Sequence, residues 1–276
     1  MNADSQFAGD PTSPTQFRMR RWLRKAAVAT AGTIVLVLGS LIMLAVAIVT
    51  LFQARRFHAE VIAKALGRIA LWLCGVRMVI HQDQPYPQRQ TIFISNHTST
   101  LDVFVLIALG LPNARFFMSG FLRKILPLGL IGYLIGIFWT APYRFHDKRL
   151  KIFQRAERIL RRTGESVFLT PEGSRITTGE IGHFNRGAFH LATNLGAPIV
   201  PIYLHIPKET DPGLGLVARK GTVDVFFLPS ITTDHWKLED LDQNREKVRD
   251  IYVAFHTKLN DGKGPSNADY SSAATR

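Results

Sequence analysis

The chain has 276 residues, enough for one domain of ordinary to large size with a well-buried core, and it contains a single cysteine, Cys74. One cysteine excludes an intramolecular disulfide framework and argues against a cysteine-based zinc site. The formal net charge of +13 indicates an anionic partner, either a nucleic acid or an anionic membrane surface.

The N-terminal part of the sequence predicts a membrane anchor. Residues 1–25 are polar and then basic, and we expect this segment to be disordered. No charged residue occurs from Ala26 to Phe52, a run long enough to cross the hydrocarbon core as a helix. A cleaved signal peptide has a shorter apolar region, so a retained anchor is favoured. The competing interpretation is a buried core helix.

The following segment, Phe57–Ile80, is apolar but interrupted by Lys64, Arg68 and Arg77. This pattern is typical of an amphipathic helix that lies in the headgroup region of a bilayer. Residues 26–80 therefore form the predicted anchor, either as a hairpin that enters one leaflet or as a single span followed by an interfacial helix. Basic residues flank the apolar run on both sides, so the positive-inside rule does not choose its orientation.

Residues 81–260 alternate between short apolar runs and segments of helical period. This succession predicts an α/β domain in which a mixed central sheet is flanked by helices. The tail, residues 261–276, is small and polar, and we expect it to be disordered. Expected strands cover 91–95, 114–118, 166–170, 198–204 and 223–228; expected helices cover 101–109, 148–162, 187–195 and 238–259; the type of the apolar segment 126–137 is left open.

The sequence NHTSTLD at positions 96–102 places His97 directly after an expected strand and Asp102 at the start of an expected helix. If the chain turns back there, the carboxylate accepts from one imidazole nitrogen and leaves the other free to take a proton. The spacing alone is weak evidence, because the polar stretches 235–240 and 256–261 share it. The competing interpretation is a structural histidine that caps the helix.

A second polar sequence, PEGSR at 171–175, also follows an expected strand directly. Gly173 lets backbone N–H groups approach a ligand closely, and Ser174 adds a hydroxyl donor. Arg175 supplies a fork that matches phosphate geometry, while Glu172 can hold an arginine or a ligand hydroxyl in place. The sequence therefore predicts an anion site here. The competing interpretation is an ordinary turn with a solvated salt bridge.

Together these motifs resemble the glycerolipid acyltransferase family that includes the 1-acylglycerol-3-phosphate acyltransferases. His97 and Asp102 match the family's first motif, His-x4-Asp, and FLTPEGSR at 168–175 matches the third. The fourth, an apolar strand around a proline, is matched at Pro201. The resemblance covers roughly residues 60–230. The family's second motif is matched up to Arg144, which the resemblance makes the candidate ligand of the acceptor phosphate. Asn185 stands where the family often has lysine, which leaves the acceptor open, lyso-ornithine lipid being one alternative.

The resemblance implies a role in phospholipid biosynthesis, in which a fatty acyl group passes from acyl-CoA or acyl carrier protein to the hydroxyl of a lysophospholipid. His97 would act as the base, Asp102 would orient it, and Arg144 together with the 172–175 turn and Pro201 would form the substrate-binding region. It implies no metal and no bound cofactor. The expected location is the bacterial inner membrane, with the active site on its cytoplasmic face.

Two alternative interpretations, each from another functional class, remain. The chain could be a hydrolase that passes the acyl group to water, or a lipid-binding protein without catalytic activity. A nucleic-acid partner is disfavoured, because the chain has an apolar anchor and no recognisable RNA- or DNA-binding motif.

Overall fold

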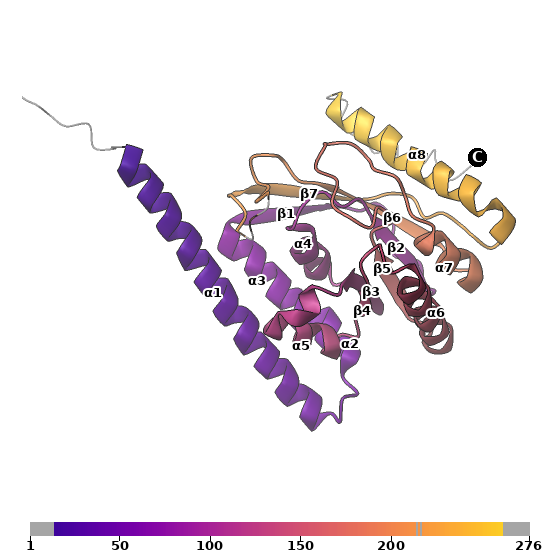
Figure 1. Cartoon of the computed structure of the whole chain (residues 1–276), viewed down its shortest axis with the longest axis horizontal. Helices are drawn as coiled ribbons and strands as arrows, with labels where there is room; N and C mark the ends of the chain where they lie inside the picture. The colour runs from indigo at the N-terminus through magenta and orange to yellow at the C-terminus, as the bar shows by residue number, and fades with distance from the viewer. Residues whose placement is uncertain (1–13, 214, 216, 262–276) are drawn as a thin grey trace, which may run out of the picture.

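The computed structural model describes residues 14–213, 215 and 217–261, and its centre is a seven-stranded sheet in the order β1-β7-β6-β2-β5-β3-β4 (Figure 1). The strands are β1 (Val76–His81), β2 (Ile92–Ser95), β3 (Ala114–Ser119), β4 (Phe138–Thr140), β5 (Ser166–Leu169), β6 (Ile199–His205) and β7 (Gly221–Phe227). The longer helices are α1 (Pro14–Val49), α3 (Lys64–Cys74), α4 (Asp102–Leu109), α5 (Leu126–Leu134), α6 (His146–Thr163), α7 (Gly187–Leu195) and α8 (Leu241–Asn260). Short helical turns are α2 (Arg55–Phe57), the π-helical η1 (His58–Ala63), and the 3-10 turns η2 (Leu122–Lys124) and η3 (Leu238–Asp240).

The sheet is mixed, as the sequence predicts. β2 is central and runs parallel to both β5 and β6, with Ile94 opposite Leu169 on one side and Pro201 on the other. β7 pairs antiparallel with β6 and parallel with β1. The carboxyl ends of β2 and β5 therefore meet at one edge of the sheet, where α/β proteins place their ligand sites.

Helices cover both faces of the sheet, and strand alternation divides the core between them. Ile92 and Ile94 of β2 point into a cluster with α6, α7 and α8, whereas Phe93 between them points into a cluster with α3 and α4. Figure 1 shows α6, α7 and α8 on one side of the molecule and α1, α3 and α5 on the other. The sheet is therefore buried between two layers of helices.

The N-terminal segment forms a helical hairpin. α1 reverses direction at residues 50–54, where Leu51 and Phe52 adopt positive φ angles, and α2, η1 and α3 return along it. The inner side of the hairpin is buried, with Met43 and Ala47 of α1 in one cluster with Ala63 and Leu66. The opposite side of α1 is an exposed apolar surface, which we call the outer face: Ile34, Val37, Leu38, Leu41, Ile42 and Ile48. Among the described residues, only the helix at Arg18–Val49 is long and apolar enough to cross a membrane.

The returning helix α3 lies very close to α4. A Cβ added at Gly67 would come within 2.9 Å of the backbone nitrogen of Ala108 and 3.0 Å of the carbonyl oxygen of Phe104. Only glycine allows this approach of the two backbones. The hairpin is thus packed directly on the helix that begins at Asp102.

Two predicted boundaries in the N-terminal part are wrong. The expected disorder falls partly on residues 1–13, which lie outside the described residues, but residues 14–25 are helical because α1 begins at Pro14. Proline is favourable in a first helical turn, and no helix breaker separates it from the apolar run. The predicted interfacial helix 57–80 ends at Cys74, because Gly75 takes the left-handed conformation (φ 72°), and Val76–His81 is an edge strand.

The other expected helices and strands are present within a few residues of their predicted ends. The segment 126–137, whose type the sequence left undecided, is helical at its start, as α5. The three-residue strand β4 is an element that the sequence did not reveal. The expected tail, apart from Asp261, lies outside the described residues.

Candidate active site

The loop after β2 brings His97 and Asp102 together. The Nδ1 atom of His97 lies 2.6 Å from Oδ2 of Asp102. A carboxylate only accepts, so Nδ1 is the donor, and Nε2 carries the free lone pair. The side chain of Asp102 is 1 % exposed and that of His97 is 21 % exposed, so the orienting group is buried while the imidazole remains accessible.

Local backbone geometry fixes Asp102. Its Oδ2 also accepts from the backbone N–H groups of Thr98 (2.9 Å) and Ser99 (3.1 Å), which lie in the turn that leads into α4. Asp102 is the first residue of that helix, where the helix dipole favours negative charge. Asp102 thus binds the turn that precedes α4, and among the residues that the structure describes no side chain caps the start of this helix by a hydrogen bond, so the capping role that competed with the catalytic interpretation is not observed.

The turn after β5 contacts the His97 loop directly. The Oε2 atom of Glu172 accepts from the backbone N–H of His97 at 2.6 Å, and the backbone N–H of Ile176 donates to the carbonyl of His97 at 2.8 Å. Gly173 has φ 71°, a conformation that glycine adopts without strain. The two predicted motifs therefore form one site.

Glu172 is not placed as the sequence suggested. Its second oxygen, Oε1, accepts from the backbone N–H of Gly182 at 2.8 Å, so backbone amides engage both carboxylate oxygens. The residue is 5 % exposed, and this burial raises the pKa of its carboxyl group against the opposing effect of the two hydrogen bonds. Glu172 therefore holds the loops together and does not present its carboxylate to a ligand.

The remaining residues of the turn face outward. Gly173 and Ser174 are exposed and Arg175 is half-buried, with Nη1 donating to the carbonyl of Gly213 at 3.3 Å. The same β6–β7 loop supplies Asp211, whose carboxylate accepts from the Ser99 hydroxyl at 2.6 Å. This loop borders the site on a third side.

Two further predicted residues lie apart from this cluster. Arg144 is exposed, with its guanidinium carbon 4.9 Å from the centre of the Phe145 ring. Within the described residues it has no hydrogen bond or ion pair to His97 or Glu172. Pro201 is buried in β6, where its carbonyl accepts from the backbone N–H of Leu228 at 2.9 Å. Its position is that of a core residue beneath the site.

Two asparagines position the loops, in roles that the sequence motifs alone do not predict. The side chain of Asn96 donates to the carbonyl of Leu204 (2.9 Å) and accepts from its backbone N–H (2.8 Å), which ties the end of β2 to β6. Asn185 donates to the carbonyls of Pro171 (2.9 Å) and Glu172 (3.0 Å) and accepts from the Tyr143 hydroxyl. For Asn96 a signal was available in the sequence, because it is a polar residue directly before His97 of the first motif.

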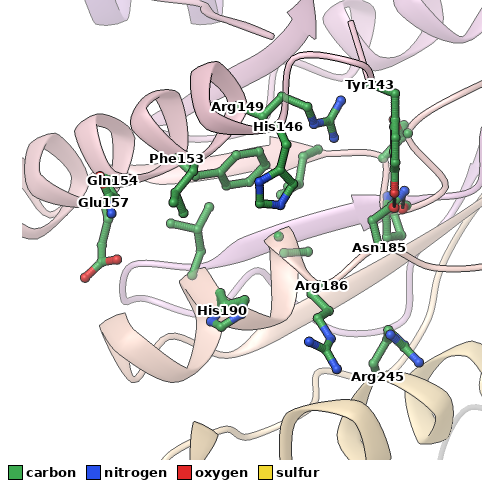
Figure 2. A pocket seen from close by; sticks show the side chains of 18 of the residues that line it. Tyr143, His146, Arg149, Phe153, Gln154, Glu157, Asn185, Arg186, His190 and Arg245 are labelled. Atoms are coloured by element: carbon green, nitrogen blue, oxygen red, sulfur yellow. Dashed lines mark hydrogen bonds between the residues drawn. The ribbon is translucent and has the colours of Figure 1, made fainter. Parts of the chain in front are cut away.

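A groove of about 710 Å³ lies on the other side of the 170–173 turn. α6, α7 and Arg245 of α8 form its walls, and Leu169, Pro171 and Gly173 contribute to its lining. Figure 2 shows Tyr143, His146, Arg149 and Phe153 on one side and Arg186, His190 and Arg245 on the other. His97 does not line this groove, but Glu172, which binds its backbone, lies between two residues that do.

Comparisons with known proteins agree with the geometry. The profile of the family described as Acyltransferase matches residues 77–205. A 1-acyl-sn-glycerol-3-phosphate acyltransferase from Limnanthes alba is 28% identical over 210 residues, covering 68% of this chain and 66% of the relative. The enzyme of that name from Pseudomonas aeruginosa is 27% identical over 170 residues, covering 59% of this chain and 64% of its own.

The chain thus spans slightly less than two thirds of the length of these two relatives. The crystal structure of the 1-acyl-sn-glycerophosphate acyltransferase PlsC from Thermotoga maritima superposes with a TM-score of 0.72, covering 86% of this chain and 96% of that one. At 18% identity, the superposition establishes the shared fold.

Proposed function

Since the profile of the acyltransferase family matches residues 77–205, we propose that this protein is an O-acyltransferase that acylates a lysophospholipid. The acceptor is 1-acylglycerol-3-phosphate and the product is phosphatidic acid. The donor is a fatty acyl thioester of CoA or of acyl carrier protein. The names of the relatives support this acceptor, and the hydrogen bond between His97 and Asp102 is the observation that carries the reaction type.

The arrangement supports direct transfer without an acyl-enzyme. Nε2 of His97 has no hydrogen-bond partner in the described part of the chain and takes the proton from the acceptor hydroxyl. The resulting alkoxide attacks the thioester carbonyl, forming the new C–O bond. The C–S bond of the tetrahedral intermediate then breaks, and the departing thiolate accepts the proton from the imidazolium. Asp102 stabilises the imidazolium throughout and keeps its charge.

The acceptor's phosphate would lie near Arg175, with Gly173 and Ser174 beside it, and Arg144 would contribute from its exposed position. This placement rests on the position of the exposed Gly173 and Ser174 and the half-buried Arg175 beside the His97 loop, and on the affinity of guanidinium groups for phosphate. Pro201 supports the site from the core.

Both acceptor and product belong to the bilayer, so the apolar outer face of α1 would hold the enzyme where its substrate is. We assign the protein to the bacterial inner membrane with the active site on the cytoplasmic side, where acyl thioesters are made. The exposed apolar side chains of α1 support the membrane part of this assignment.

The decisive experiment is an assay of the purified full-length protein against a panel of lysolipids, including lyso-ornithine lipid, with both acyl-CoA and acyl carrier protein as donors. We expect phosphatidic acid from 1-acylglycerol-3-phosphate and little product from the other acceptors. Release of free fatty acid independent of any lysolipid would indicate a hydrolase. Lysolipid binding without turnover would indicate a non-catalytic lipid-binding protein.

A further inference from the structure

The groove described above opens on the side of the sheet that the hairpin does not cover. Its walls come from α6, α7 and α8, whereas α1 and α3 pack on the opposite side (Figure 1). A lipid acceptor held at the outer face of α1 and a water-soluble donor can therefore reach the same sheet edge from different directions. The groove ends at the 170–173 turn, whose Glu172 binds the backbone of His97.

The lining of the groove is strongly basic. Three arginines and three histidines face one carboxylate, that of Glu157, which already accepts from Arg161 (3.0 Å) and Asn194 (2.9 Å). The arginines are Arg149, Arg186 and Arg245, and the histidines are His146, His183 and His190. Such a lining favours an anionic ligand.

The three arginines are not equivalent. Arg186 and Arg245 share Asp242, and Arg245 also pairs with Glu246. Arg149 has no carboxylate partner within the described residues, and its Nη1 makes one long hydrogen bond, 3.3 Å, to the carbonyl of Ala141. Its guanidinium carbon lies 4.7 Å from the centre of the Tyr143 ring, so its plane is held by an aromatic group while its remaining donors are available.

The groove also offers apolar surface next to these charges. Phe153 and Leu191 line it together with Leu169. Its volume lies in the range of roughly 300–1,000 Å³ typical of sites for drug-sized ligands. A ligand that combines phosphates with a flat heteroaromatic ring would meet both kinds of surface.

We propose that this groove binds the phosphate-bearing nucleotide of coenzyme A, so that acyl-CoA is the donor and its pantetheine arm passes the Gly173 turn toward His97. This inference rests on the proposed function. Arg149 is the principal phosphate ligand, with Arg186 and Arg245 adding to it. A concave site of this size suits a nucleotide better than the convex surface of a carrier protein, which makes acyl carrier protein the alternative for the test.

The test is titration calorimetry of the detergent-solubilised full-length protein with CoA, 3′-dephospho-CoA and pantetheine. We expect CoA to bind most tightly and pantetheine most weakly. Arg149→Ala should weaken CoA binding about tenfold or more, the effect of losing one charge-assisted contact, and should raise the KM for acyl-CoA with a smaller change in kcat. Arg158→Ala is the matched control, because Arg158 is exposed on the same helix and does not line the groove.

A second variant avoids dependence on Arg149 alone. Leu150 is half-exposed and lines the groove, so Leu150→Glu should weaken CoA binding by charge repulsion while Leu150→Gln should not. An unchanged KM for acyl-CoA in both Arg149→Ala and Leu150→Glu would overturn the proposal, as would transfer from acyl carrier protein alone. In either case a wild-type enzyme that still acylates lysolipid leaves the proposed function intact, whereas the absence of transfer from every donor would contradict that function itself.

Discussion

The backbone amide of His97 donates to the carboxylate of Glu172 across 75 positions of sequence, at 2.6 Å. The same carboxylate accepts from Gly182, and Asn185 fixes the carbonyl of Glu172 from the other side. One buried side chain thus connects the loop of the proposed catalytic base with the turn proposed to hold the acceptor. Its substitution should affect the position of the base more than the affinity for substrate.

Glu172→Gln should lower kcat more than it raises KM, since the amide replaces one accepting oxygen with a donor that faces a backbone N–H. The loss of that hydrogen bond should cost about 1–3 kcal/mol of stability. Glu172→Ala should be worse on both counts. Steady-state kinetics and denaturant unfolding of the purified variants measure the two effects, and a variant with normal kcat and a raised KM would point to direct substrate contact.

The titration of Glu172 gives a second readout. Its folded-state pKa lies above the ordinary value of 4.5, so the folded protein binds this proton more tightly than the unfolded chain. The stability that it contributes is fully present below pH 4.5 and is lost as pH rises through the folded-state pKa. A glutamine does not titrate, so the stability difference between wild type and Glu172→Gln should shrink with rising pH over that window. Unfolding midpoints measured from acid to neutral pH test this prediction. A stability difference between wild type and Glu172→Gln that stays constant with pH would contradict it.

His97→Ala should reduce kcat by about 10²–10⁴-fold, the usual contribution of a general base, and leave membrane association unchanged. His81 provides the matched control, because it lies in the edge strand β1, where its Nε2 is 2.8 Å from the carboxylate of Asp224 in the neighbouring strand β7. His81→Ala should retain full activity. Equal losses in the two variants would indicate a structural effect of histidine removal.

Arg175→Ala and Arg144→Ala should raise the KM for lysophosphatidic acid about tenfold, because each removes a charge-assisted contact to phosphate. A monoacylglycerol acceptor has no phosphate, so its slower acylation should not change. Arg162→Ala, an exposed position at the end of α6, is the control. If only Arg175 responds, the Arg144 assignment is wrong.

Glu165 sits between two arginines in a buried network. It forms ion pairs with Arg55 of the hairpin and Arg115 of β3, and its side chain is 7 % exposed. Glu165→Ala leaves two partly buried guanidinium groups unpaired and should cost about 3–5 kcal/mol. Glu239→Ala, which removes an exposed ion pair with Lys237, should cost under about 1 kcal/mol. Denaturant unfolding monitored by circular dichroism distinguishes these outcomes.

The outer face of α1 should determine membrane binding. Leu38→Lys and Leu41→Lys each place a charge in the apolar helix, at a cost of about 2.5–3.5 kcal/mol when the site lies in hydrocarbon. We expect the double variant to leave liposomes in a flotation assay while Leu238→Lys, at an exposed leucine before α8, floats like wild type. Unchanged flotation of the double variant would contradict the role of this face.

The chain order of the central elements was predictable because their strands are buried on both faces and read as continuous apolar runs. The His97–Asp102 pair was predictable for a related reason, since its geometry is local to one turn. The edge strand β1 was not, because Arg77 and His81 interrupt its apolar residues in a way that also fits an amphipathic helix. The role of Glu172 could not be read from its neighbours, because its partner loop lies far away in sequence.

The glycine contact between α3 and α4 has a mechanical consequence. With no side chain between the two backbones at Gly67, nothing soft is available to absorb a displacement of one helix relative to the other. A displacement of the hairpin should therefore be passed to α4 and to the aspartate at its first residue. The position of the hairpin and the alignment of the His97 imidazole should therefore be mechanically coupled.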